Sequence, residues 1–297
     1  MKTECIICKI PTTYFLTKDG YSYNRCSSCG LVFVVSEPSN QVKVRDLYSE
    51  QSGYQGNKKK SLIGTTASPN QEKVLSWLSR QKKGRLLDIG CSNGEFMWLA
   101  KEAGFEVLGV ELNKRTADIA RGNGLNVISG FLEDAGFADN SFDYVYMGDL
   151  IEHVESPNAL MEQVKRVLRQ EGKVVIVTPN LDCFWSKATY KLYQWFGIPW
   201  SSLTPPYHLF QFSTLNLDSL MSHYGFTSQK HMYGLPPRLS YELGSLHLLK
   251  RYKQGKTILS LVFMCFSFFL YAVVYVMNFA SKPFREKDLS VIGMYGK

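Results

Sequence analysis

The chain has 297 residues, is 45% hydrophobic and carries a formal net charge of +8. This length and composition exclude a disordered or fibrous protein and leave room for one large domain with smaller attachments. The excess of positive charge lies at the two ends, because residues 1–84 and 181–297 each sum to +7 while residues 85–180 sum to −6.

The first eleven residues contain no apolar segment behind a basic start, which argues against a secretory signal and predicts a cytoplasmic protein with reduced cysteines. Four cysteines form two C-x2-C pairs separated by seventeen residues, a spacing typical of a zinc site: Cys5, Cys8, Cys26 and Cys29. We therefore predict a zinc ribbon over residues 1–35, with a hairpin between the pairs. Four thiolates leave no open coordination position, which indicates a structural ion. The alternative is reduced cysteines packed in a small core.

Residues 36–68 are polar and are predicted to be a linker or lid. A helix should begin at Ser68-Pro69-Asn70-Gln71, because the serine can cap it, proline suits the first position and glutamine completes a capping box. This helix opens the main predicted domain, residues 69–297.

Strand and helix patterns alternate at short intervals from Arg85 onward. The predicted strands are RLLDI, FEVLGVEL, LNVIS, FDYVYM and GKVVIVT, and helical patterns such as PNALMEQVKRVLRQ lie between them. This order predicts an α/β fold with a doubly wound, mostly parallel sheet. Ligands of such folds bind beyond the carboxyl ends of the strands.

The segment GCSNG, residues 90–94, fits two glycine-rich patterns only superficially. It matches the G-x-S-x-G of a hydrolase elbow, yet it follows the first core strand and no upstream HGG-type oxyanion segment precedes it. The dinucleotide pattern G-x-G-x-x-G would need glycines where Ser92 and Glu95 stand. We therefore expect a nucleotide loop of another kind.

Two acids flank this loop at predicted strand ends. Asp88 lies two residues before Gly90, and Glu111 ends the second strand, where a carboxylate can accept hydrogen bonds from both hydroxyls of a ribose. A diphosphate would be repelled here, whereas a nucleoside with a positive charge would be attracted. Ordinary solvated acids at strand ends are the alternative.

At this point the sequence resembles the class I S-adenosylmethionine-dependent methyltransferases, whose first motif reads D-x-G-C-G-x-G. The resemblance continues through GFLEDAGFADNSFDYVYMGDLIEHVESP, EGKVVIVTPN and PPYHLFQFSTLNLDSLMSHYGF, so it covers nearly everything from residue 68. Ribbons of the C-x2-C…C-x2-CGLVF kind also precede the catalytic domain in some bacterial members. The resemblance implies a Rossmann-like seven-stranded sheet and S-adenosylmethionine as cofactor.

The resemblance also assigns cofactor contacts. It implies that the loop backbone approaches the methionine part, that Asp88 orients the loop or the amino group, and that Glu111 holds the ribose. The full set of implied cofactor-binding residues is Asp88, Gly90, Cys91, Gly94, Glu111, Leu112 and Leu132. Two departures from the family pattern are Ser92 in place of the second glycine and Phe131 in place of the usual acid after the third strand.

Methyl transfer requires alignment of a nucleophile with the methyl group and sometimes removal of a proton. Asp149, Glu152 and His153 in GDLIEHV would share one face if that stretch were helical. We expect His153 to be a general base or substrate orienter, with Asp149 near the cofactor and His208 as a further catalytic candidate. Alternatively, Glu152 and His153 brace the following loop, or the cluster holds a divalent ion.

Two segments indicate an apolar substrate or a membrane. Residues 183–200 interleave aromatic residues with lysines, and residues 181–212 are predicted to form a substrate cover. Residues 258–280 are uncharged and long enough to cross a bilayer, yet the last residues resemble the final strand of the methyltransferase sheet. We therefore expect a C-terminal hydrophobic helical insertion, either one helix or a broken helical hairpin, embedded in the cytoplasmic leaflet of the inner membrane and packed against its own domain. The alternatives are a single span and a fully buried helix.

Together these features predict transfer of a methyl group from S-adenosylmethionine to a small, amphiphilic or lipid-linked acceptor at the cytoplasmic membrane face. An RNA methyltransferase that uses the ribbon and the basic ends is a second possibility, although RNA has no need of the uncharged segment. A membrane scaffold without activity is a third, because Ser92 and Phe131 depart from the family pattern.

Overall fold

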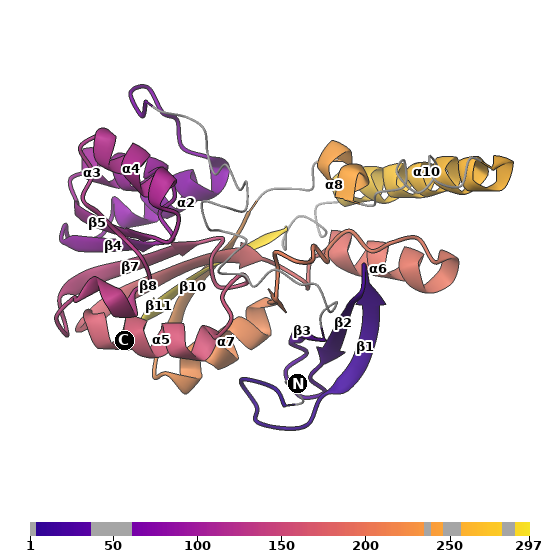
Figure 1. Ribbon diagram of the computed structural model, residues 1–297, viewed down its shortest axis with the longest axis horizontal. Coiled ribbons are helices and arrows are strands. Elements are labelled where there is room, and N and C mark those ends of the chain that lie inside the picture. Colours follow the sequence, from indigo (N-terminus) through magenta and orange to yellow (C-terminus); the bar gives the residue numbers. More distant parts are fainter. Residues whose placement is uncertain (1–3, 37–60, 235–238, 246–256, 281–288) are drawn as a thin grey trace.

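The computed structural model describes residues 4–36, 61–234, 239–245, 257–280 and 289–297, and Figure 1 shows their arrangement. Most of the predicted linker, residues 37–60, lies outside the described residues. Within the described parts, a small β-sheet near the N-terminus lies beside a large sheet flanked by helices, and two long helices lie next to each other on the same side as the small sheet (Figure 1).

The small sheet is built on the expected hairpin. Strand β1 (Thr13–Lys18) pairs antiparallel with β2 (Tyr21–Arg25), which pairs with β3 (Val32–Ser36). Asp19 and Gly20 turn the chain with φ of 51° and 84°, as a tight hairpin turn requires. A fourth strand, β9 (Phe210–Gln211), pairs with β3, although it lies far along the chain. The N-terminal hairpin therefore shares its sheet with the main domain.

The large sheet confirms the predicted mostly parallel seven-stranded architecture. Its order is β10-β11-β8-β7-β4-β5-β6. Its strands are β4 (Arg85–Ile89), β5 (Glu106–Glu111), β6 (Val127–Ser129), β7 (Phe142–Gly148), β8 (Leu168–Pro179), β10 (Thr227–Tyr233) and β11 (Ser290–Gly296). Strand β11 runs antiparallel between β10 and β8, while the β6-β5-β4-β7-β8 pairs are parallel.

Helices cover both faces of this sheet, so its central strands are buried on both sides (Figure 1). One face carries α2 (Pro69–Leu78), α3 (Glu95–Glu102) and α4 (Lys114–Gly122), and the other carries α5 (Pro157–Val167) and α7 (Thr214–His223). The capping box expected at the start of α2 is present, with Ser68 and Gln71 exchanging side-chain and backbone hydrogen bonds.

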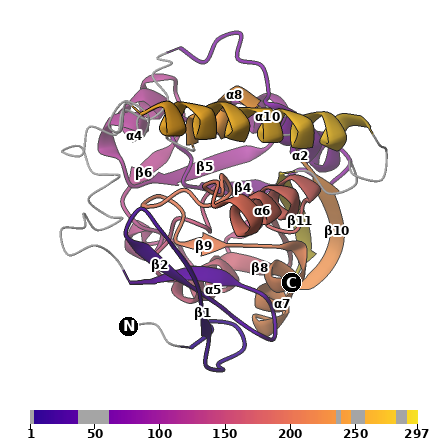
Figure 2. The ribbon, with the colours of Figure 1, turned by 90° about the vertical axis from the view of Figure 1, so that its right-hand side faces the viewer.

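Three further helices lie outside the layers that cover the sheet (Figure 1): α6 (Phe184–Phe196), α8 (Leu239–Ser245) and α10 (Ile258–Ala280). Figures 1 and 2 show α10 next to α6, outside the two layers that cover the sheet. In the chain, α10 lies between β10 and β11, so both elements that bracket it are neighbours in one sheet. A short 3-10 helix, Glu133–Ala135, follows β6.

Candidate functional site

The glycine loop follows β4 and turns sharply before α3. Gly90, Ser92 and Gly94 have φ of 75°, 51° and 85°, which place all three in the left-handed region. Glycine enters this region without strain, whereas a serine there costs about 1–2 kcal/mol. Ser92, which replaces a glycine of the resembled motif, therefore adopts the same left-handed conformation at an energetic cost.

Glu111 ties this loop to the end of the neighbouring strand. Its Oε2 accepts a hydrogen bond of 2.8 Å from the backbone N–H of Ser92, and its Oε1 accepts one of 2.8 Å from the N–H of Asn113. Each carboxylate oxygen can accept more than one hydrogen bond, so these two bonds orient the group and leave capacity for hydroxyls of a ligand.

Asp88 and Glu111 form an acidic pair at the ends of β4 and β5, in which Asp88 is buried and Glu111 is half-buried. Asp88 is 2% exposed. Burial raises the pKa of Asp88 well above its ordinary value, with a smaller contribution from the charge of Glu111. Burial likewise raises the pKa of Glu111, against the opposing effect of its backbone hydrogen bonds. A ligand with a positive charge and hydroxyls would offset this desolvation, so the residues present fit S-adenosylmethionine.

The other residues expected at the cofactor are spread around this pair. Cys91 is buried, and its Sγ lies against Gly109 of β5, so its side chain packs beneath the loop. Leu132 is buried in the core and Leu112 is partly exposed after β5. Contact of Gly90, Cys91, Gly94, Leu112 and Leu132 with a cofactor stays a prediction.

The segment after β7 approaches the glycine loop. A Cβ placed on Gly90 would lie 3.0 Å from Leu150 Cδ1, so the two loops are in contact. Residues 149–153 form a turn instead of the helix on which their shared face depended. Asp149 begins the turn with φ of 50°, and its N–H donates to the carbonyl of Val177. Although Asp149 is solvent-exposed, desolvation by the surrounding protein raises its pKa to about 6.

The turn brings three side chains together. Glu152 Oε1 lies 3.8 Å from His153 Nε2, and the rings of His153 and His208 meet edge to face with centroids 4.7 Å apart. One potential ligand atom from each of the three residues lies within 4.8 Å of the others. The two histidines are far apart in the sequence, so the fold creates this cluster.

Burial sets the protonation of the cluster. Burial lowers the pKa of His208 to about 3, with a smaller contribution from His153, and also lowers the pKa of His153. Burial and the nearby Asp149 raise the pKa of Glu152 well above its ordinary value. Both imidazoles are therefore neutral at physiological pH and can accept a proton or a ligand's hydrogen bond.

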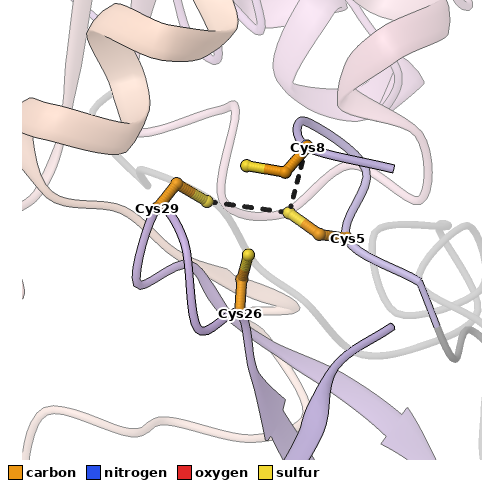
Figure 3. A group of neighbouring side chains, drawn as sticks. All are labelled: Cys5, Cys8, Cys26 and Cys29. Carbon is orange, nitrogen blue, oxygen red and sulfur yellow. Dashed lines mark hydrogen bonds between the residues drawn. The ribbon is translucent and has the colours of Figure 1, made fainter. Parts of the chain in front are cut away.

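The four N-terminal cysteines point toward a common centre (Figure 3). Cys5 Sγ and Cys29 Sγ are 3.6 Å apart, too far for a disulfide, and none of the four forms one. Two thiolates on one tetrahedral zinc ion would lie about 3.8 Å apart. The backbone N–H of Cys8 also points at Cys5 Sγ at 3.5 Å. The donor set and its spacing therefore fit zinc.

No sequence pattern indicates that the ribbon supports the His208 segment. Phe33 of β3 pairs with Phe210 of β9, and the N–H of Val34 donates to the carbonyl of Leu209. The N–H groups of Leu209 and Phe210 in turn donate to the carbonyl of Glu152. A two-residue strand has no recognisable sequence pattern, so only the tertiary pairing reveals this connection.

The predicted cover contacts both the ribbon and α10. Lys18 Nζ donates to the carbonyls of Trp200 and Leu203, and Phe15 stacks on Tyr190 at 5.3 Å. On the other side, Tyr271 Oη of α10 donates to the carbonyl of Pro199. The stretch 199–203 is thus held from two directions.

Among the described residues, α10 is the one helix long and apolar enough to cross a membrane, judged by length and composition alone. Only 17% of its most hydrophobic window is buried. The buried side chains include Ser267, Tyr271, Val274 and Asn278, which form a single stripe. The large exposed side chains are all apolar: Ile258, Leu259, Leu261, Val262, Phe266, Phe269, Val273, Val276 and Met277. With Trp195 and Phe196 of α6, they form what we call the apolar face.

Comparisons with known proteins identify the main domain. The chain is 37% identical over 105 residues to an uncharacterized protein of Methanocaldococcus jannaschii, an alignment that covers 35% of this chain and 49% of that protein. It is 25% identical over 182 residues to a demethylmenaquinone methyltransferase of Staphylococcus saprophyticus, covering 54% of this chain and 77% of that enzyme. The chain thus spans about half the length of the first of these relatives.

A solved SAM-dependent methyltransferase structure from Thermotoga maritima aligns with a TM-score of 0.49 and 19% identity, covering 77% of this chain and 89% of that one. The sequence model of a family described as a methyltransferase domain matches residues 65–231, more than half of the 297 residues. The matched residues include the glycine loop, Asp88, Glu111 and the Glu152–His153–His208 cluster. The chain therefore belongs to the methyltransferase domain family.

Proposed function

We propose that this protein transfers a methyl group from S-adenosylmethionine to a small amphiphilic or lipid-linked acceptor that it takes from the cytoplasmic face of the inner membrane. The observation that carries the proposal is the apolar face of α6 and α10, which is joined through residues 199–203 to the segment that holds His208. A series of contacts thus links the glycine loop, the two histidines and the apolar face.

The proposed binding of the methyl donor rests on Asp88 and Glu111. Glu111 would hold the ribose hydroxyls, and Asp88 would orient the loop or interact with the positively charged methionine part. When bound, S-adenosylmethionine supplies an electrophilic methyl group on its sulfonium. The chain contributes a left-handed loop that brings its backbone close to this ligand, together with a carboxylate pair that favours a positive charge.

The acceptor half rests on the turn after β7. Because Leu150 contacts the glycine loop, the neighbouring His153 lies close to the expected position of the donor. We propose that His153 accepts a proton or a hydrogen bond from the acceptor, that His208 helps to position it, and that Asp149 lies near the cofactor. The neutral imidazoles suit this role, since each keeps a nitrogen lone pair.

The apolar face supports membrane attachment without a crossing. A helix of 23 residues is about 35 Å long. Its buried stripe is anchored by Tyr271, whose ring packs edge to face on Trp185 and whose hydroxyl bonds Pro199. A helix that spans the bilayer would give up these contacts, whereas a helix lying in the interface retains them and buries its apolar side in lipid.

Calorimetric titration with S-adenosylmethionine tests the donor site. Loss of two charge-assisted hydrogen bonds in Glu111→Ala should weaken binding by about 100-fold. Glu106→Ala is the matched control, because Glu106 begins the same strand and pairs with Arg85 on the surface. Equal affinities of the wild type and Glu111→Ala would remove Glu111 from the site.

Vesicle binding tests the membrane surface. Phe269→Asp and Leu215→Asp change side chains that are each 63% exposed, the first on α10 and the second on α7. We expect only Phe269→Asp to reduce sedimentation with anionic lipid vesicles. Mass spectrometry of lipid extracts from cells with and without the protein should then reveal a product heavier by one CH₂ group. If methylated RNA is found instead, or if the full chain stays soluble and does not bind vesicles, the lipid proposal is wrong.

A further inference from the structure

We propose that Glu152, His153 and His208 form a binding site for a first-row divalent metal ion, separate from the cysteine cluster. Binding of the metal stands on the geometry of these three residues alone. The suggestion that the metal holds the methyl acceptor rests, in addition, on the proposed function.

The first observation is two buried polar atoms without hydrogen-bond partners. Glu152 is 1% exposed, and its Oε1 accepts no hydrogen bond. The Nδ1 of His208 is also buried and has no hydrogen-bond partner. Leaving such an atom unsatisfied costs about 1–3 kcal/mol, and more for a charged group. Two such atoms in one cluster therefore indicate a missing positive charge or donor between them.

The tautomer of His153 adds a third acceptor. Its Nδ1 lies 2.8 Å from the carbonyl oxygen of Tyr207, and a carbonyl can only accept, so Nδ1 carries the proton. In the neutral ring, Nε2 then has a lone pair, and this nitrogen lies 3.8 Å from Glu152 Oε1. Histidine ligands of metals are held in this way, with the second ring nitrogen donating to a carbonyl or carboxylate.

The potential ligand atoms of the three side chains are close enough to bind one ion. Ligand atoms at about 2.0–2.2 Å from one ion are about 3.0–3.5 Å apart, so the Glu152–His153 pair needs to close by less than about 1 Å. All three potential ligand atoms are within 4.8 Å of one another. Rotation of side chains can supply this movement without a change of the backbone.

The backbone and the outer contacts are already fixed. Thr178 Oγ1 donates to the second oxygen of Glu152 at 2.9 Å, which orients the carboxylate. The carbonyl of Glu152 accepts the N–H groups of Leu209 and Phe210, which tie it to the segment that begins at His208. The three side chains therefore come from two segments that are hydrogen-bonded to each other, as a preorganised site requires.

The donor set selects the kind of metal. Two imidazole nitrogens and one carboxylate oxygen suit manganese, iron, cobalt or zinc, whereas calcium and magnesium prefer oxygen ligands alone. Three protein ligands leave coordination positions open, unlike four thiolates. An oxygen of the acceptor bound there would become more acidic and would lose its proton to water, since His153 as a ligand cannot accept it. The oxygen could then bond to the methyl group as the bond between that group and the sulfonium sulfur breaks.

Titration of the full-length, zinc-loaded protein with Mn²⁺ tests the site. The electron paramagnetic resonance signal of free Mn²⁺ should fall with a stoichiometry of one ion per chain, because manganese does not displace zinc from thiolates. Co²⁺ binding, followed by visible absorption, is the second probe. Glu152→Gln and His208→Ala should each weaken Mn²⁺ binding by at least about 10-fold. His223→Ala, a change at the exposed end of α7, should leave it unchanged.

Circular dichroism and S-adenosylmethionine binding show whether each variant is folded, and Glu152→Gln is nearly isosteric. The inference is wrong if neither ion binds, or if folded Glu152→Gln and His208→Ala bind Mn²⁺ as tightly as the wild type. Methyl transfer that persists in metal-free protein would remove the role in catalysis while leaving the proposed function intact. Conversely, Mn²⁺ binding without any S-adenosylmethionine binding would support the metal site and contradict the proposed function.

Discussion

The two clusters of potential metal ligands in this protein differ in chemistry and in position. The cysteine cluster brings four sulfurs of one kind to a common centre in a small hairpin unit. The Glu152–His153–His208 cluster brings mixed donors together from two segments that are distant in the sequence. The first arrangement can be completed by one ion with no position left, and the second leaves positions open. This contrast underlies the structural role predicted for the first cluster and the chemical role proposed for the second.

The two clusters are nevertheless physically connected. Strand β3 leaves the second cysteine pair and pairs with β9, two residues beyond His208. The carbonyl of Glu152 accepts hydrogen bonds from the same segment. Disturbing the ribbon should therefore affect the candidate catalytic residues, although no cysteine lies among them.

Cys26→Ser should have the largest effect. Structural zinc contributes on the order of 10 kcal/mol or more to the folding of a small domain, so loss of one thiolate should unfold the ribbon and abolish methyl transfer. Cys265→Ser, which changes an exposed cysteine of α10, is the control. Zinc content and hydrogen exchange at Phe33 and Phe210 provide the measurement. Retained protection of Phe210 in a zinc-free variant would disprove the connection between the clusters.

Removal of metal should distinguish the two clusters. A brief treatment with a chelator should strip the open Glu152–His153–His208 site first and lower the rate of methyl transfer by about 100-fold, the order expected for loss of a Lewis acid. Zinc held by the cysteine cluster should stay with the protein, since four thiolates would enclose it. Activity should return on addition of Mn²⁺ or Co²⁺. Unchanged activity after complete loss of non-zinc metal would contradict the assignment of roles.

Thr178→Val should have an intermediate effect. It removes the hydroxyl that orients Glu152, and loss of such an outer contact typically weakens metal binding by about 10- to 100-fold. Thr189→Val is a matched control, because Thr189 is equally buried and its hydroxyl bonds carbonyls of its own helix and interacts with Tyr271 of α10. Mn²⁺ affinity measured on both variants decides the matter, and equal affinities would mean that Thr178 does not support the site.

Phe15→Ala should have the smallest effect. Phe15 stacks on Tyr190 and meets Trp200 edge to face, so its loss should loosen the cover without unfolding the ribbon. Aromatic contacts of this kind contribute about 0.5–1.5 kcal/mol, which corresponds to a two- to tenfold rise in KM for the acceptor. Tyr14→Ala, on the opposite and 67% exposed side of the same strand, should leave KM unchanged. A change in kcat alone would indicate another role for Phe15.

The local elements were predictable because local patterns encode them. The RLLDI segment became β4 with the predicted bounds, and the capping box at Ser68 starts α2 as expected. Apolar periodicity and capping chemistry act over a few residues, so they can be read without knowledge of the fold. Asp88 and Glu111 could also be located from local patterns, since both stand at the ends of predicted strands. Residues at the ends of neighbouring parallel strands meet at one edge of the sheet.

The conformation of the turn that carries Glu152 and His153 could not be predicted from local patterns. Its spacing suggested one face of a helix, but the chain forms a turn with Asp149 at positive φ. The full burial of Glu152 and the approach of His208 depend on a pairing between β3 and β9. A strand of two residues gains its stability from its partner and not from its own propensity.

The sequence by itself determined the alternation of strands and helices, the spacing of the four cysteines and the acids at the ends of the first two strands of the main sheet. These features depend on neighbours within a few residues. Only the tertiary structure decided which side of α10 is buried, that the ribbon shares a sheet with the main domain, and that His153 and His208 meet. Those outcomes depend on contacts between distant segments, whose closure brings groups together that no local pattern relates.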